Sequence, residues 1–158
     1  ENTFHMWLPV TGFISDETYF LRPDPDTTVT EPGNAEGVLT FSGYDARNGS
    51  IWYDSGRGYT RNGRIKPDLA APAVEVAAVN LWGRVTTLTG SSAAAALGAG
   101  ACALLLEWGI VRGNVPAMDS ITIQRYLIRG ANRLNIFDYP NKTWGYGSLD
   151  LYDAFRAI

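Results

Sequence analysis

Residues 85–108, VTTLTGSSAAAALGAGACALLLEW, contain the pattern that decides the fold class of this chain. A short β-prone run at 85–88 is followed, after one tight turn, by a long apolar run that contains no proline. The first run predicts a strand and the second, residues 93–108, predicts a helix that ends near Gly109. A strand, a turn and an apolar helix in succession indicate an α/β layer architecture.

The predicted helix is apolar on every side. Its most apolar part, residues 93–106, is shorter than the roughly 20 residues needed to cross a bilayer. We therefore expect a core helix that is buried on all sides, and no membrane span. The single cysteine, Cys102, lies in this run, so it is expected to be a small core residue, and an intramolecular disulfide or a Cys-rich zinc site is excluded.

Shorter elements are expected on both sides of this segment. Strands are predicted at 38–44 and 51–53, and the nearly continuous apolar run at 74–81 is typical of a strand covered on both faces, as in a parallel sheet. Helices are predicted from Asp119 or Ser120 to Gly130 and near 150–157. The opening residues are β-prone and the proline-bearing stretch at 22–32 predicts a linker, so we place a domain boundary between 1–31 and 32–158.

The composition excludes some classes of function. With 13 basic and 16 acidic side chains the net charge is -3, which argues against a nucleic-acid binder with a basic face. Charged residues make up only 18% of the chain, against about 25% in an average domain, which indicates a large buried fraction or a surface that meets another polypeptide. No carboxylate cluster has EF-hand spacing, so no metal and no cofactor is expected. Nothing in the chain is typical of a signal peptide, and the residues alone do not indicate a compartment.

Ser92 is the candidate catalytic residue of this sequence. It stands where the predicted strand gives way to the predicted helix, and the first N–H groups of a helix lack partners and favour negative charge. A serine there could attack a carbonyl while nearby N–H groups bind the oxyanion. The alternative is a structural N-cap serine. The nucleophile elbow of α/β-hydrolases is excluded, because Ala94 replaces its last glycine and no histidine follows Ser92.

Three segments match one family in order and at natural spacing. They are residues 55–60 (SGRGYT), 63–72 (GRIKPDLAAP) and the stretch that begins GSSAA at 90. Together they resemble the C-terminal, nucleophile-bearing part of the subtilisin-like serine peptidases. The resemblance implies part of a three-layer α/β/α fold with a mostly parallel sheet. Two positions differ from the family pattern, which usually has threonine at Ser91 and glycine at Ala73.

Further stretches are similar to the clostridial (Firmicutes) spore-germination branch of the family. They are 23–25 (PDP), 106–109 (LEWG), 127–131 (LIRGA), 139–141 (YPN) and 144–147 (WGYG). In that branch a β jelly-roll precedes this part of the domain, so the resemblance makes the first residues the tail of that insertion. It also suggests a secreted or spore-associated protein and a polypeptide substrate.

The resemblance assigns a catalytic role to one side chain of this sequence, Ser92. Ser92 would be the acyl-forming nucleophile and its backbone N–H part of the oxyanion hole, whereas the family's aspartate, histidine and oxyanion asparagine belong to segments before Glu1. Asp54 imitates the aspartate motif but is interpreted as a turn carboxylate, and His5, the only histidine, as structural. Because a serine without a general base is a poor nucleophile, the fragment alone is expected to be inactive.

Two functions of different classes follow. The first is a serine endopeptidase in the intact protein, where the missing N-terminal half of the domain is a partner of these residues. The second is a pseudoprotease, a binding or signalling module in spore germination that keeps the fold without the activity. In either case the isolated chain is expected to expose apolar surface and to self-associate.

Overall fold

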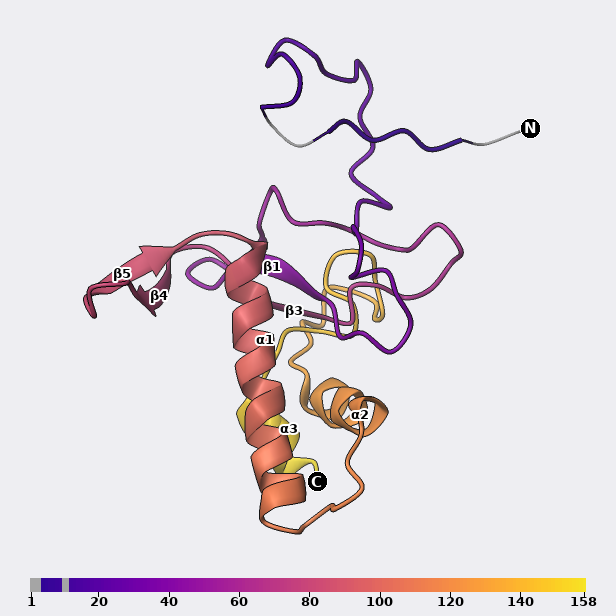
Figure 1. The fold of residues 1–158 in the computed structure, drawn as a ribbon. Coiled ribbons are helices and arrows are strands. Elements are labelled where there is room, and N and C mark those ends of the chain that lie inside the picture. Colours follow the sequence, from indigo (N-terminus) through magenta and orange to yellow (C-terminus); the bar gives the residue numbers. More distant parts are fainter. Residues whose placement is uncertain (1–3, 10–11) are drawn as a thin grey trace.

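The computed structural model describes residues 4–9 and 12–158 (Figure 1). Its elements follow in the order β1 (Phe41–Asp45), β2 (Ser50–Ile51), β3 (Leu69–Pro72), β4 (Val76–Val79), β5 (Val85–Leu88), α1 (Ser91–Leu106), the π-helical turn η1 (Glu107–Val111), α2 (Ser120–Gly130) and α3 (Leu151–Arg156). The α/β prediction is confirmed.

The sheet that supports the rest of the molecule has the strand order β2-β1-β3. Strand β1 pairs in parallel with β3 and antiparallel with β2. The outer edge of β3 is also paired, since Ala70 N donates to Gly147 O at 2.9 Å and Leu149 N donates to Ala70 O at 2.7 Å. Strand β3 is therefore the most buried strand of the described residues, with Leu69, Ala70 and Ala71 fully buried. The sequence gives no periodic signal for this strand, because its four residues are too few.

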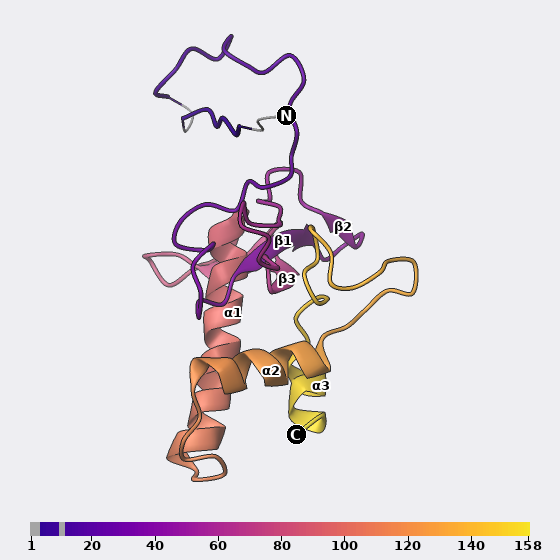
Figure 2. The ribbon, with the colours of Figure 1, turned by 90° about the vertical axis from the view of Figure 1, so that its right-hand side faces the viewer.

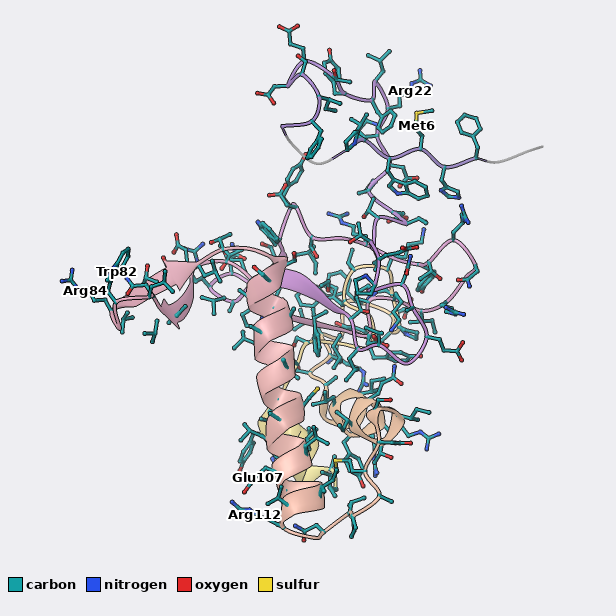
Figure 3. All side chains as sticks on the ribbon, in the orientation of Figure 1. Met6, Arg22, Trp82, Arg84, Glu107 and Arg112 are labelled. Atoms are coloured by element: carbon teal, nitrogen blue, oxygen red, sulfur yellow. The ribbon has the colours of Figure 1, made fainter. Side chains whose placement is uncertain are left out.

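One strand prediction is wrong in its pairing. The run at 74–81 does not enter a parallel sheet, because β4 folds back on β5 as an antiparallel hairpin that projects from the body (Figure 1). Asn80 Oδ1 closes the turn by accepting hydrogen bonds from Trp82 N and Arg84 N. Trp82 and Arg84 lie at the tip, away from every other element (Figure 3). Leu81 and Trp82 at the turn of this hairpin are 97% and 79% exposed, whereas Val76 and Ala78 of β4 are half-buried.

Helix α1 packs on the sheet through one face only. A Cβ on Gly98 would lie 2.2 Å from the Phe41 ring, so glycine is needed for the close approach of α1 to β1. The face on the sheet is buried, and it consists of Ala93, Ala94, Gly98, Ala101 and Leu105. The opposite face is exposed, including Leu97 and Leu104. The prediction of a helix buried on all sides is therefore wrong for the residues described.

The end of α1 also differs from the prediction. The helix does not stop at Gly109 but continues through η1 to Val111. A Cβ on Gly109 would lie 2.4 Å from Met118 Cε, so this glycine allows close packing instead of capping the helix. The segment Ser91–Val111 is long and apolar enough to cross a membrane by length and composition. A core helix passes the same test, and α1 does pack on β1 and β3.

The last two helices confirm their predictions. Asp119 caps α2, where its side chain accepts a hydrogen bond from Thr122 N at 2.8 Å. Asp150 caps α3 in the same way through Asp153 N. The two helices cross closely at Gly130, where a Cβ would lie 2.1 Å from Ala154 N (Figure 2). Both share one core with α1 and β3.

A buried ion pair fixes the start of β3. Lys66 Nζ donates to Asp68 Oδ2 at 2.7 Å, and both side chains are almost completely buried. The carboxylate also accepts from Thr40 N at 2.7 Å and, through Oδ1, from Gln124 Nε2 at 2.6 Å. A buried carboxylate needs such partners. Asp68 thereby joins the entry to β1, strand β3 and helix α2.

The residues before β1 are arranged differently from the body. Within residues 4–9 and 12–40 the structure contains no helix and no strand. The beginning of this stretch loops away from the sheet in both views, and Phe4, Phe13 and Leu21 are exposed (Figures 1 and 2). The jelly-roll tail and the domain boundary at 31 stay predictions.

Candidate active site around Ser92

The turn before α1 is held in place by the end of β3. Gly90 N donates to Ala73 O at 2.8 Å, and Glu75 N donates to Thr89 Oγ1 at 2.9 Å. Gly90 has φ +156°, and a Cβ there would lie 3.2 Å from Ser92 Oγ. Glycine therefore gives the turn its conformation and leaves room for the serine hydroxyl.

Ser92 is the second residue of α1, and its side chain is exposed. The N-cap is Gly90, so the alternative of an N-cap serine is wrong. Within the described part of the chain, neither Ser92 Oγ nor Ser92 N–H makes a hydrogen bond. The hydroxyl and the N–H group are therefore both free to meet a ligand at the positive end of the helix.

Ser92 opens onto a cleft of about 1090 Å³. One wall is helix α1, which contributes Ser91, Ser92, Ala95, Gly98, Ala99 and Cys102. The facing walls come from residues 23–33, 38–41 and 53–57. The lining is more apolar than polar, and its charged members are Asp24, Glu31, Asp54 and Arg57.

The wall opposite Ser92 is tied down by backbone hydrogen bonds. Thr28 N donates to Arg57 O at 2.8 Å, and Arg57 N donates to Thr28 Oγ1 at 3.0 Å. Lys142 holds the same segment through an ion pair with Asp26, and this hydrogen bond raises the pKa of Lys142. The stretch that was predicted to be a linker thus forms part of the cleft. Its composition gave no signal for this role, because its contacts are to residues far along the chain.

The other sequence candidates lie as follows. Asp54 lines the cleft as an exposed turn residue. His5 is not among the lining residues of this cleft, since it stacks on Trp7 with ring centroids 5.7 Å apart in the segment before β1. Cys102 is half-buried against the cleft, and burial raises the pKa of its thiol. The structure therefore does not bring the only histidine to Ser92.

The unusual Ala73 is accommodated by its neighbours. The Ala73 side chain is completely buried. A Cβ added to Gly43 would lie 2.5 Å from the Cβ of Ala73. Ala73 is not among the residues of the described chain with positive φ. An alanine therefore fits this position without backbone strain, because Gly43 on β1 leaves space for it.

Over residues 4–9 and 12–158, no three His, Cys, Asp or Glu side chains come together as a metal site would require.

Comparisons with known proteins agree on one family. The Subtilase family model matches residues 21–147. A structure of the Clostridium perfringens CspB protease superposes with a TM-score of 0.84 and 38% identity, covering 88% of this chain and 30% of that one. The prenylagaramide maturation protease PagA superposes with a TM-score of 0.68 and 25% identity, covering 85% of this chain and 47% of that one.

A sequence relative is known from another organism. An uncharacterized protein of Aquifex aeolicus, aq_aa18, is 39% identical over 88 residues, covering 48% of this chain and 39% of the relative. The chain thus spans less than half the length of each of these proteins. The family match covers the cleft, the Lys66–Asp68 pair, the hairpin and Ser92, so this chain belongs to the subtilase family of peptidases.

Proposed function

We propose that this chain supplies the nucleophile side of a serine endopeptidase, with Ser92 as the residue that forms the acyl-enzyme. The observation that carries the proposal is the position of Ser92, which lies exposed at the second residue of α1 and faces a cleft of about 1090 Å³. Membership of the subtilase family and similarity to the CspB protease support it.

The chemistry follows from the free groups at this site. Ser92 Oγ attacks the carbonyl carbon of the scissile peptide bond, and its proton passes to a histidine that the rest of the peptidase domain supplies. The oxyanion accepts a hydrogen bond from Ser92 N–H, which has no partner among the described residues. The amine leaves with that proton, and water then hydrolyses the acyl-enzyme.

The chain by itself is proposed to be inactive. Its only histidine is His5, which stacks on Trp7 in the segment before β1. Without a general base the Ser92 hydroxyl stays protonated at neutral pH and reacts slowly. The exposed face of α1 also gives the isolated chain an apolar surface, for which we propose self-association.

The test is Ser92→Ala in the intact protein, with Ser91→Ala as the matched control at the adjacent exposed position. We expect Ser92→Ala to lower kcat by about 10⁴-fold or more and to abolish labelling by a fluorophosphonate, which reacts only with an activated serine. Ser91→Ala should keep both. If the unmodified intact protein neither cleaves peptides nor labels, the pseudoprotease alternative replaces this proposal.

A further inference from the structure

Arg57 is the cationic residue among those that line the cleft of Ser92. Its Nε is buried, and within the described chain it has no hydrogen-bond acceptor. By contrast, Arg64, from the same loop, donates to Asn34 O at 3.4 Å and pairs with Glu36 at 3.3 Å. The side chain of Arg64 therefore ties its loop to residues 34–36, whereas the side chain of Arg57 makes no such contact with the described residues.

The terminal nitrogens of Arg57 differ from its buried Nε. Its two terminal nitrogens form no ion pair or hydrogen bond with the residues that the structure describes, and they are not among the buried unpartnered atoms. They are therefore accessible, and Arg57 lines the cleft onto which Ser92 opens. The backbone of Arg57 is fixed by its two hydrogen bonds to Thr28, so the side chain starts from a rigid base.

A buried donor without an acceptor is costly, whereas an exposed charge is solvated by water. The carboxylates of Glu31 and Asp54, which also line the cleft, belong to exposed residues and so carry no such cost. Arg57 is thus the charged lining residue that has a buried polar atom without a partner among the described residues, and its accessible terminal nitrogens are left to bind a ligand. Its planar fork of donors suits a carboxylate, which it can bind through two parallel hydrogen bonds.

We propose that Arg57 is a specificity-determining residue that binds a carboxylate of the polypeptide substrate, so that the enzyme prefers a glutamate or aspartate near the scissile bond. The inference rests on the proposed function, because it uses the cleft of Ser92 as the substrate site. Arg57 is the one cationic residue of the described lining, whereas Asp24, Glu31 and Asp54 would repel a substrate carboxylate placed beside them, so the preference for an acidic residue is expected only at the position next to Arg57.

The experiment uses the intact protein and a mixed peptide library to find the preferred cleavage sequence. Matched peptides with Glu or Gln at each position around the scissile bond then give kcat/KM ratios. A charge-assisted hydrogen bond predicts a preference for Glu of about 10-fold or more at one position. Arg57→Gln should abolish this preference, and Arg57→Lys should keep part of it. Arg64→Gln is the matched control and should leave the preference unchanged.

Charge reversal gives a second readout. Arg57→Glu should turn the preference toward Lys at the same position, because all four charged lining residues would then be acidic. Thermal unfolding of each variant separates selectivity from stability. If the Arg57 variants lose stability and lower kcat/KM equally for Glu and Gln peptides, Arg57 is structural and the inference is overturned.

The outcome for Ser92 stays separate. If the unmodified protein labels with fluorophosphonate but shows no preference for Glu, the inference fails and the proposed function stands. If it neither labels nor cleaves, the proposed function fails, and fluorescence anisotropy with the same Glu and Gln peptides still tests Arg57. If the protein binds the Glu peptide more tightly than the Gln peptide and Arg57→Gln removes this difference, the inference holds for a binding cleft. Equal affinity of the unmodified protein for the two peptides overturns it.

Discussion

The two faces of helix α1 have similar composition but opposite surroundings. Leu105 on one face is completely buried between the sheet and α2, whereas Leu104, its neighbour in sequence, is 52% exposed. Gly98 on the buried face touches the Phe41 ring, whereas a Cβ on Gly100 would meet no atom within 4 Å. Because the hydropathy of α1 is high on all sides, the elements packed against the helix determine which of its residues are buried.

The exposed face has a consequence for the whole domain. Apolar side chains that remain in water contribute no hydrophobic stabilisation, and about 25 cal/mol per Å² becomes available when another surface covers them. The chain spans 30% of the CspB protease chain. We propose that the remainder of the peptidase domain covers this face in the intact protein.

The largest effect is expected from shortening one leucine on each face. Leu105→Ala removes a fully buried side chain and should lower the free energy of unfolding by about 2–5 kcal/mol. Leu104→Ala should cost less than about 1 kcal/mol in the 158-residue chain, because half of the side chain already meets water. Urea denaturation of the two variants measures the difference. Equal losses in this chain would show that the two faces do not differ in burial, and a larger loss for Leu104→Ala in the intact protein would show that another surface covers the exposed face.

A smaller effect is expected from adding one methyl group to each face. Gly98→Ala would place a Cβ 2.2 Å from the Phe41 ring, so it should destabilise the protein by about 1–3 kcal/mol. Gly100→Ala meets no atom within 4 Å and should stabilise the helix by about 0.5–1 kcal/mol, because alanine has the higher helix propensity. Thermal unfolding of the two variants should give shifts of opposite sign. Shifts of the same sign would show that the approach of Phe41 does not limit the buried face.

The smallest effect is expected at Asp45, the last residue of β1, on which the buried face of α1 packs. Arg47 donates to both carboxylate oxygens of Asp45, through Nε at 2.9 Å and Nη2 at 2.8 Å, and these hydrogen bonds lower the pKa of Asp45 to about 2. The unfolded value is about 3.9, so the folded state is stabilised above about pH 4 and loses this contribution as the pH falls toward 2.

Acid titration of stability tests this contact. Asp45→Asn should flatten the dependence of the unfolding midpoint on pH between about 4 and 2, because asparagine does not titrate. Asp16→Asn, an exposed position before β1, is the matched control and should leave the slope unchanged. An unchanged slope in Asp45→Asn would show that the contact with Arg47 does not stabilise the end of β1.

Much of the fold could be predicted where the signal is local. The bounds of β5 and α2 follow from short-range patterns, namely a β-prone run before a turn and an aspartate N-cap before an amphipathic run. The pairing of β4 could not be predicted, because a short apolar run is compatible with a buried parallel strand or with an exposed hairpin. The turn at Asn80 decides between them, and its hydrogen bonds form only when the two strands meet.

The candidate site divides in the same way. Ser92 can be predicted from the sequence, because neighbouring residues indicate the strand before it and the helix after it. The residues around it also match the family pattern. The facing wall at residues 23–33 and the place of Arg57 in the cleft could not be predicted, because their contacts join segments about 30 residues or more apart. No local pattern records which of two arginines in one loop has a partner.

The sequence by itself determined the α/β class, the helix that begins beside Ser92 and the family, because these depend on patterns of neighbouring residues. The packing of distant segments decided which face of α1 is buried, that residues 23–33 line the cleft, and that Arg57 Nε has no acceptor among the described residues. The physical reason is that burial and hydrogen-bond satisfaction belong to groups brought together in space, whereas helix and strand propensity belong to the chain itself.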